Sequence, residues 1–458
     1  MMPARPVVMK FGGSCLRDSD GVRKLVSIVS DEKRCAVVVS AMSGVTDSIL
    51  RTITGRLEER DIESFVRQLA DRHLGLLGEL CSGKTLVHYS SDVNRLVSTF
   101  SRILYGVYYT GELTPRMQSF LMSFGERLSA RIVAAALESA GASPRIFDAD
   151  RLPLYTDGSY DAASALLAPT RKSSFRKLNT ALERSQIPVV TGFFGISREG
   201  HVTLLGRNGT DYSASVVAYA MGAGKLIIWK DVDGFLTADP SYVRGAKLIS
   251  ELSYDEAAEL SYFGADVLHP KAVDPAKEGN IEVRIMNILN PSSPGTLITS
   301  SRKQTLGIVK SVSCLENLAI VRVYVSGGGF QSGTISHMSG FLGRAGVNII
   351  SATTSQTCIA FLVGRSDTEV AVGSLRETVG HGTEKIETEK DAALMCAVGE
   401  GLGNTRGIAA KVFSAISEKG VNVGMMSAGA SKAAYHFTVG MDVLGDAMNA
   451  VHAVFFGD

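Results

Sequence analysis

The chain has 458 residues, enough for about two to four domains of ~100–200 residues each. Its apolar content of 45% is ordinary for a globular protein, and its net charge of +1 argues against a polyanionic partner such as nucleic acid. The six cysteines are scattered without a CxxC pair, which indicates reduced thiols rather than a disulfide framework or a zinc site. No apolar run reaches the ~18 residues of a membrane span, and no signal-peptide apolar region opens the chain. We therefore expect a cytoplasmic protein that binds neither nucleic acid nor membrane.

Short apolar runs alternate with segments of helical period over the first three hundred residues. This alternation predicts an α/β fold in which helices sandwich a mainly parallel sheet. Residues 57–110 are charged, helical in period and poor in strand formers, so we expect a helical insertion there. The expected strands are 7–9, 37–39, 187–190 and 226–229, and the expected helices include 120–138 and 212–221.

A cluster of turn residues, Asn290–Gly295, precedes one short strand and a polar stretch, which predicts the end of a first domain, 1–300. The remaining chain contains a weak internal repeat. Each copy places Gly-Val-Asn after a helix, at 346–348 and at 420–422, and a strand follows soon afterwards. We expect two small α+β domains of βαββαβ order, 305–388 and 389–458, that pack together.

A Gly pair, Gly12-Gly13, follows the first apolar strand and stands between Lys10 and Ser14. A strand that ends at glycines leaves backbone N–H groups open to phosphate oxygens, and a neighbouring Lys adds a positive charge. We expect Lys10 to lie exposed at the end of its strand. This pattern predicts a phosphate-binding loop.

Five segments occur in a characteristic order: KFGGS (10–14), SAMSGVT (40–46), SFGERLSA (123–130), LGRNGTDYSA (205–214) and WKDVDGFLTADP (229–240). Together they resemble the aspartate kinase family. The resemblance extends to YFGADVLHP (262–270), and the two C-terminal repeats resemble paired ACT domains. It covers nearly the whole chain and implies an amino-acid-kinase-like fold.

The resemblance implies transfer of a phosphoryl group from ATP, with Mg2+, to the β-carboxylate of L-aspartate. The product, 4-phospho-L-aspartate, is the first intermediate toward lysine, threonine and methionine. The resemblance also implies feedback inhibition by lysine or threonine, and a homodimer or homotetramer assembled through the ACT domains. An aspartate side-chain carboxyl group in water has a pKa of ~3.9, so it is ionised at neutral pH and needs no general base. His269 is accordingly read as structural.

The residues expected to contact aspartate come from four of these segments. By resemblance, Glu126 binds the α-ammonium group and Arg207 binds the α-carboxylate. Ser40 contacts phosphate and Thr46 contacts aspartate. An Arg fork suits bidentate capture of a carboxylate. Thr46 can alternatively be the N-cap of a helix that begins near Asp47, and Arg127 can simply hold Glu126. The full set is Ser40, Thr46, Glu126, Arg207, Gly209 and Thr210.

Catalysis is assigned to Lys10, which bridges ATP and acceptor, and to Asp211, which organises Lys10 or the metal. Thr210 and Asp211 stand near a helix N-terminus, which favours anions, although N-capping is an alternative role. The expected ATP contacts are Lys10, Gly12, Gly13, Ser14, Lys230, Asp231, Leu236 and Ser241, and no protein side chain is assigned to bind a metal directly.

Four residues depart from the usual pattern of the family on the ATP side. Lys230 replaces a frequent Thr, Asp266 a Lys, Ser241 an Arg, and Leu236 a Tyr. We infer that Lys230 supplies the cation that is missing at Asp266. If it does not, the chain is a catalytically inactive amino-acid sensor of the same fold.

Effector binding is assigned to the turns of the C-terminal repeats, although a Gly-Val-Asn turn also ends ordinary helices. The candidates are Asn348, Ile349, Ser355, Gln356 and Asn422. Another amino-acid kinase of this fold is a further alternative. No GxGxxG follows the repeats, so we expect a monofunctional enzyme rather than a fusion to homoserine dehydrogenase.

Overall fold

The computed structural model describes residues 5–55, 58–264, 267–300, 308–325, 332–377 and 383–457. These residues form two compact units. The first comprises Met1–Phe235, Ser250–Tyr254 and Val267–Ser301, and the second comprises Leu236–Ile249, Asp255–Asp266 and Arg302–Asp458. The predicted domain limits near 300 and 388 stay predictions. Two segments from before residue 300 cluster with the C-terminal part of the chain.

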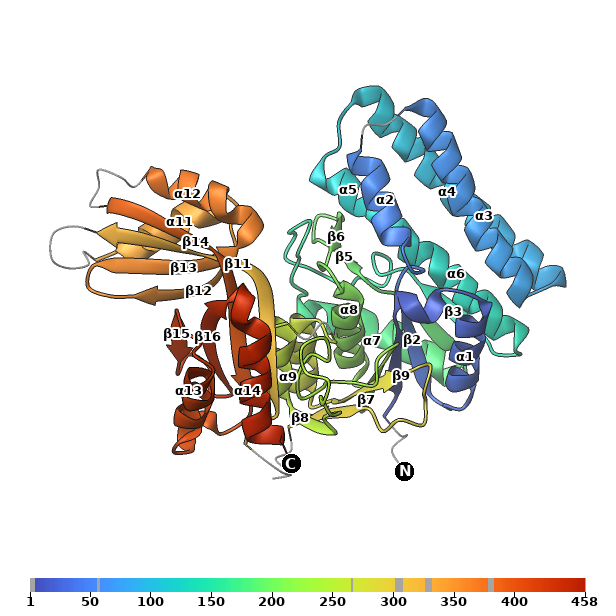
Figure 1. The fold of residues 1–458 in the computed structure, drawn as a ribbon. Coiled ribbons are helices and arrows are strands. Elements are labelled where there is room, and N and C mark those ends of the chain that lie inside the picture. The colour runs from blue at the N-terminus through green and yellow to red at the C-terminus, as the bar shows by residue number, and fades with distance from the viewer. Residues whose placement is uncertain are drawn as a thin grey trace. The chain divides into compact units, whose positions relative to one another are not determined.

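An eight-stranded sheet in the order β3-β4-β2-β1-β7-β9-β10-β8 forms the centre of the first unit (Figure 1). All neighbouring strands are parallel except β9 and β10. The predicted mainly parallel sheet is therefore confirmed. Its strands are β1 (Val7–Phe11), β2 (Cys35–Val39), β3 (Pro144–Phe147), β4 (Ile187–Thr191), β7 (Lys225–Lys230), β8 (Glu251–Ser253), β9 (Glu282–Asn287) and β10 (Thr296–Thr299). A separate hairpin pairs β5 (Phe194–Ile196) with β6 (Val202–Leu204).

Helices pack on both faces of this sheet. The helices α1 (Ser19–Ser30) and α6 (Phe124–Ser139) contact each other, and α8 (Gly209–Met221) contacts α7 (Leu167–Glu183) and α10 (Val273–Gly279). Every residue of α8 is buried, because this helix is apolar on nearly all sides. The helix α6 contacts β2, β3 and β4, and α8 contacts β1, β2 and β7, so both helices lie against the central strands of the sheet.

The described part of the expected insertion is a pair of long helices, α3 (Glu59–Leu80) and α4 (Gly83–Thr110), which pack along each other (Figure 1). The helix α2 (Val45–Thr54) precedes them. The single helix expected over 120–138 is in fact two, α5 (Pro115–Met122) and α6. The chain turns at Ser123, whose hydroxyl donates to the carbonyl of Phe120, a local bond that competes with helix continuation.

A six-stranded antiparallel sheet in the order β12-β13-β11-β14-β16-β15 forms the second unit. Its strands are β11 (Ser311–Val325), β12 (Ile349–Thr354), β13 (Cys358–Gly364), β14 (Thr383–Val398), β15 (Met426–Ala428) and β16 (Ala434–Gly440). Its helices are α9 (Tyr254–Tyr262), α11 (Thr334–Arg344), α12 (Thr368–Arg376), α13 (Ile408–Glu418) and α14 (Leu444–Phe456).

The first repeat has the expected βαββαβ order, from β11 to β14. The second copy differs in one respect. Three of its strands are β14, β16 and β15. The fourth is supplied by Ser311–Leu315, the first part of β11, which pairs with residues 394–398 of β14. The two copies therefore share both long strands in one sheet and are not separate along the chain.

The segment Leu236–Ile249 contributes to the core of the second unit. Ala238 forms a β-bridge with Val312, and Val243 packs in the same buried cluster as Met395 and Phe437. Within the residues that the structure describes, no helix is long and apolar enough to cross a membrane.

Candidate active site

Four neighbouring parallel strands, β4, β2, β1 and β7, end at the same edge of the first sheet. Ligands bind at the carboxyl ends of strands in open α/β sheets. The residues at or just past these ends are Phe193, Ser40, Gly12 and Lys230. The strand order thus gathers segments that are far apart in sequence.

Two lysines and a carboxylate form a buried cluster at this edge. Lys10 Nζ lies 2.7 Å from Asp211 Oδ1, and Lys230 Nζ lies 3.1 Å from Asp211 Oδ2. The backbone N–H of His269 also donates to Asp211 Oδ2, at 3.3 Å. The expectation that Lys10 is exposed is wrong: it is 5% exposed, because the residue faces Asp211 in the first turn of α8.

The charge of this cluster follows from its geometry. Burial alone would raise the pKa of Asp211, but the positive charges of Lys10 and Lys230 outweigh it and lower that pKa to about 2. Asp211 is therefore ionised throughout the neutral range. With two lysines against one carboxylate, the cluster keeps one positive charge to offer to an anion.

The Gly pair lies close to this cluster and to the loop after β2. A Cβ at Gly12 would lie 3.3 Å from Lys10 Nζ, and one at Gly13 would lie 3.0 Å from the carbonyl oxygen of Ala41. Ser14 belongs to a one-turn 3-10 helix, Gly13–Leu16. Side chains at these two positions would crowd the lysine and the neighbouring loop, so the geometry favours glycine there.

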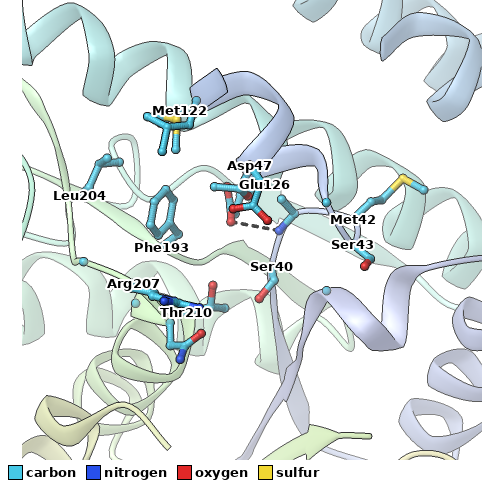
Figure 2. Close-up of a pocket in the computed structure, with 18 of the residues that line it drawn as sticks. Ser40, Met42, Ser43, Asp47, Met122, Glu126, Phe193, Leu204, Arg207 and Thr210 are labelled. Carbon is cyan, nitrogen blue, oxygen red and sulfur yellow. Dashed lines mark hydrogen bonds between the residues drawn. The ribbon is translucent and has the colours of Figure 1, made fainter. Parts of the chain in front are cut away.

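Glu126 is a buried carboxylate with one oxygen left over. Its Oε1 accepts a hydrogen bond from the backbone N–H of Ala41 at 3.0 Å (Figure 2). Its Oε2 is buried and has no hydrogen-bond partner among the described residues. Burial raises the pKa of Glu126 to about 8, against the lowering effects of the Ala41 N–H and of Arg127 and Lys10. A cation that reached Oε2 would stabilise the ionised form.

A pocket of about 780 Å³ opens beside Glu126 and the Gly pair. Figure 2 shows Arg207 and Thr210 together at one side of this pocket and Glu126 at another, with Ser40 and Phe193 between them. The lining residues are Gly13, Ser14, Ser40, Ala41, Met42, Ser43, Gly44, Thr46, Asp47, Leu50, Gln118, Met122, Glu126, Asp161, Phe193, Leu204, Gly206, Arg207, Asn208, Gly209 and Thr210. All six residues assigned to aspartate are among them.

Two of the local predictions need correction. Thr46 is not an N-cap, because α2 begins at Val45 and its N-cap is Gly44, which has a positive φ of 75°. Arg127 does not hold Glu126 by a direct bond in the described structure. Its guanidinium pairs with Asp150 at 3.0 Å and lies 4.7 Å over the ring of Phe194.

The ATP-side residues are only partly brought together. Gly13 and Ser14 line the pocket, whereas Lys10, Gly12 and Lys230 are not among its lining residues. Lys10 and Lys230 pair with Asp211, and Gly12 lies beside the Lys10 ammonium group. Asp231 is exposed. Leu236 and Ser241 fall in the second unit, where Ser241 donates to Asp239 through both its N–H and its hydroxyl. Asp266 lies outside the described residues.

The sequence patterns did not identify several wall residues of the pocket. Phe193 is the most informative, because it lies two residues after the end of β4 and adopts a left-handed φ of 68°, which is uncommon for a residue with a side chain. Its place after a strand that neighbours β2 is the signal that could have identified it. The others include Asp47, Gln118, Met122 and Asp161.

The expected effector residues lie on the second sheet. Ser355 closes the turn between β12 and β13, since its Oγ accepts from the N–H of Cys358 and its N–H donates to the Cys358 carbonyl. Asn348, Gln356 and Asn422 are exposed, and Ile349 begins β12. β12 and β15 are the outer strands of this sheet, so the two Gly-Val-Asn turns precede opposite edge strands.

Comparison with known proteins agrees with this architecture. The amino acid kinase family matches residues 5–287, and an ACT domain matches residues 395–455. Aspartokinase 3, chloroplastic, from Arabidopsis thaliana is 33% identical over 466 residues, covering 98% of this chain and 81% of the relative. Aspartokinase 2, chloroplastic, from the same plant is 31% identical, with 98% and 84% covered.

Two crystal structures of aspartokinase III from E. coli share the fold over 98% of this chain and 99% of theirs. The complex with aspartate and ADP (R-state) has a TM-score of 0.86, and the complex with lysine and aspartate (T-state) has 0.80, both at 25% identity. These matches confirm the resemblance that the five segments indicated: the chain belongs to the aspartokinase family of phosphotransferases, with an amino acid kinase fold followed by an ACT region.

Proposed function

We propose that this chain transfers the γ-phosphoryl group of MgATP to the β-carboxylate of L-aspartate in the pocket beside Glu126. The observation that carries the proposal is the buried, unpartnered Oε2 of Glu126 in the same pocket as Arg207. An α-amino acid carries one ammonium group and one α-carboxylate. The Glu126 carboxylate can pair with the ammonium group, and the Arg207 guanidinium can pair with the α-carboxylate. L-Aspartate held in this way leaves its β-carboxylate for the chemistry.

In the proposed reaction, an oxygen of the β-carboxylate attacks the γ-phosphorus. A new P–O bond forms, the bond from phosphorus to the bridging oxygen of ADP breaks, and ADP leaves with the electron pair. The acceptor is already ionised, so no proton has to be removed. Catalysis then depends on position and on positive charge near the transferred group. The Gly12-Gly13 backbone, Ser14, Lys10 and Lys230 would supply both, and Mg2+ would enter on the nucleotide phosphates.

The position of Lys230 supports an active enzyme rather than an inactive sensor. The ammonium groups of Lys230 and Lys10 pair with the same Asp211 carboxylate. Lys230 is the last residue of β7, which pairs with β1, the strand that leads into the Gly12-Gly13 loop. This is where a substitute cation for the one missing at Asp266 would be needed. Leu236 and Ser241 remain proposed nucleotide contacts.

We also propose feedback control through the second unit. The E. coli aspartokinase III structure with lysine makes lysine the first effector to test, with threonine as the alternative. The proposed binding residues are Asn348, Ile349, Ser355, Gln356 and Asn422. We further propose a homodimer or homotetramer through the ACT region, and a cytoplasmic location.

The test is acyl-phosphate formation, trapped as the hydroxamate, by the full chain with MgATP and L-aspartate, L-glutamate or N-acetyl-L-glutamate. We expect product with L-aspartate. Glu126→Gln and Arg207→Lys should raise the KM for aspartate much more than the KM for ATP, because Lys cannot reproduce the bidentate fork. Arg198→Lys, at an exposed residue outside the pocket, is the matched control. Absence of product with every acceptor would favour the inactive sensor. Product with L-glutamate or N-acetyl-L-glutamate but not with L-aspartate would refute L-aspartate as the substrate.

A further inference from the structure

The loop after β2 is held by hydrogen bonds to both of its neighbours in the first unit. The N–H of Ser40 donates to the carbonyl of Phe11 at the end of β1, at 3.1 Å. On the other side, Ser129 of α6 donates its hydroxyl to the carbonyl of Ser40 at 2.5 Å. The N–H of Ala41 donates to Glu126 Oε1, also from α6. The loop thereby connects the strand that leads into the Gly pair with the helix that carries Glu126.

The last two bonds involve the two ends of one peptide group. The carbonyl of Ser40 and the N–H of Ala41 belong to the same peptide unit, and α6 contacts both through side chains three residues apart, Ser129 and Glu126. Residues at this spacing lie on one face of a helix. A planar peptide group held at its oxygen and its nitrogen is restrained from rotating, which holds the backbone of Ser40 in place beside the pocket.

The same pair of bonds determines what Glu126 can do. Because Oε1 is committed to Ala41, Oε2 is the oxygen left for the pocket. Without the bond from Ser129, the Ser40–Ala41 peptide could turn, and Glu126 would lose the partner that orients its carboxylate. Ser129 itself is 1% exposed and does not line the pocket.

We propose that Ser129 is a positioning residue for the amino-acid substrate: through the Ser40–Ala41 peptide it holds both the backbone of Ser40 and the substrate-facing oxygen of Glu126 in place. This inference rests on the proposed function, since it assumes that the ammonium group of the substrate binds Glu126. It adds a residue that touches no substrate but determines the affinity for one of the two substrates.

The test compares Ser129→Ala with Ser174→Ala. Ser174 is equally buried, and its hydroxyl donates to the carbonyl of Leu152, also at 2.5 Å, outside the pocket. Both variants therefore lose the same kind of bond. We expect Ser129→Ala to raise the KM for aspartate roughly 10- to 100-fold, since small misplacements in a site have effects of this size, with the KM for ATP within about twofold. Ser174→Ala should change neither of the two KM values, although its melting temperature should fall about as much as that of Ser129→Ala.

A second variant and a second readout separate positioning from general damage. Ser129→Cys keeps a weak donor in nearly the same shape, so its KM for aspartate should lie between those of wild type and Ser129→Ala. The pH profile of kcat/KM for aspartate should move to higher pH in Ser129→Ala, because the Ala41 N–H that lowers the pKa of Glu126 is no longer held in place.

Equal increases of both KM values, or an unchanged KM for aspartate in Ser129→Ala, would overturn the role of Ser129. So would a Ser129→Cys variant no better than Ser129→Ala. A wild-type chain that forms no aspartyl phosphate would instead refute the proposed function, so the two failures are distinguishable.

Discussion

Lys10, Lys230 and Asp211 show how single residues set the charge of the site. Lys10 and Lys230 come from adjacent strands, β1 and β7, and both face the one carboxylate in the first turn of α8. The Asp211 carboxylate therefore offsets one of the two positive charges and leaves the other at the ends of β1 and β7.

Lys10→Met should lower kcat for aspartyl phosphate by ~10²–10³, the usual effect of removing one preorganised charge or donor from a developing negative charge. Because Lys10 is buried against Asp211, we also expect destabilisation of about 1–3 kcal/mol in chemical denaturation, moderated by Lys230. Lys225→Met, at a half-exposed lysine of β7 paired with Glu282, is the control. Near-normal turnover in Lys10→Met would remove Lys10 from the mechanism.

The raised pKa of Glu126 predicts a pH dependence of aspartate use. Only the ionised carboxylate attracts an ammonium group, so kcat/KM for aspartate should rise as the pH increases through about 8. Glu126→Gln should lower kcat/KM and abolish this inflection. A profile with the same inflection in both proteins would assign it to another group.

The same shift has a consequence for stability. A carboxyl group whose pKa is higher in the folded than in the unfolded chain contributes stability below the unfolded value of ~4.3, and this contribution is lost as the pH rises through about 8. The melting temperature of the ligand-free protein should therefore fall more steeply between pH 5 and pH 8 in wild type than in Glu126→Gln.

Among the elements, α6 and α8 position most of the site. Both were predicted from apolar helical patterns, and their contacts with strand ends follow from the α/β order. The break between α5 and α6 at Ser123 was not predictable from the period, because it depends on one local hydroxyl bond. The burial of Lys10 was missed for a similar reason: a strand-end lysine is exposed unless a distant residue, here Asp211, lies against it.

The contact between α6 and the loop after β2 leaves no room at Gly125. A Cβ there would lie 2.7 Å from the Cβ of Ala41. We expect Gly125→Ala to separate the helix from the loop, to cost about 1–3 kcal/mol in unfolding free energy and to raise the KM for aspartate. Gly106→Ala in α4 meets no atom within 4 Å and should be neutral or stabilising by up to ~1 kcal/mol. Equal stability of the two variants would contradict this packing.

At the scale of the whole molecule, the chain enters the second compact unit twice before residue 300 and returns to the first unit each time. The alternating pattern of the first three hundred residues correctly predicted the mainly parallel sheet, and the repeat correctly predicted the α+β class of the C-terminal part. It did not reveal that Leu236–Ile249 and Asp255–Asp266 cluster with the C-terminal part, or that β11 completes the second copy of the repeat. Such long-range pairing leaves no local signal in composition or periodicity.

Truncation after Ile298 should therefore not give a simple, effector-insensitive kinase. It would remove the partners of Ala238 and Val243, which lie 3% and 4% exposed in a core with residues of β11, β14 and β16. We expect the truncated protein to melt at a lower temperature and to bind an apolar dye more strongly than the full chain. A truncated protein as stable as the full chain, with full activity, would contradict this account.

The central claim is that Lys230 supplies the cation on the ATP side of the reaction, and the kinetics of Lys230→Met with varied MgATP test it most directly. Hydroxamate formation would be measured beside Lys225→Met, at the other end of the same strand. We predict that kcat/KM for MgATP falls ~10²–10³-fold in Lys230→Met, with the KM for aspartate changed only a few-fold, and that Lys225→Met behaves as wild type. Wild-type ATP kinetics in Lys230→Met would show that Lys230 has no part in phosphoryl transfer and would contradict the site described above.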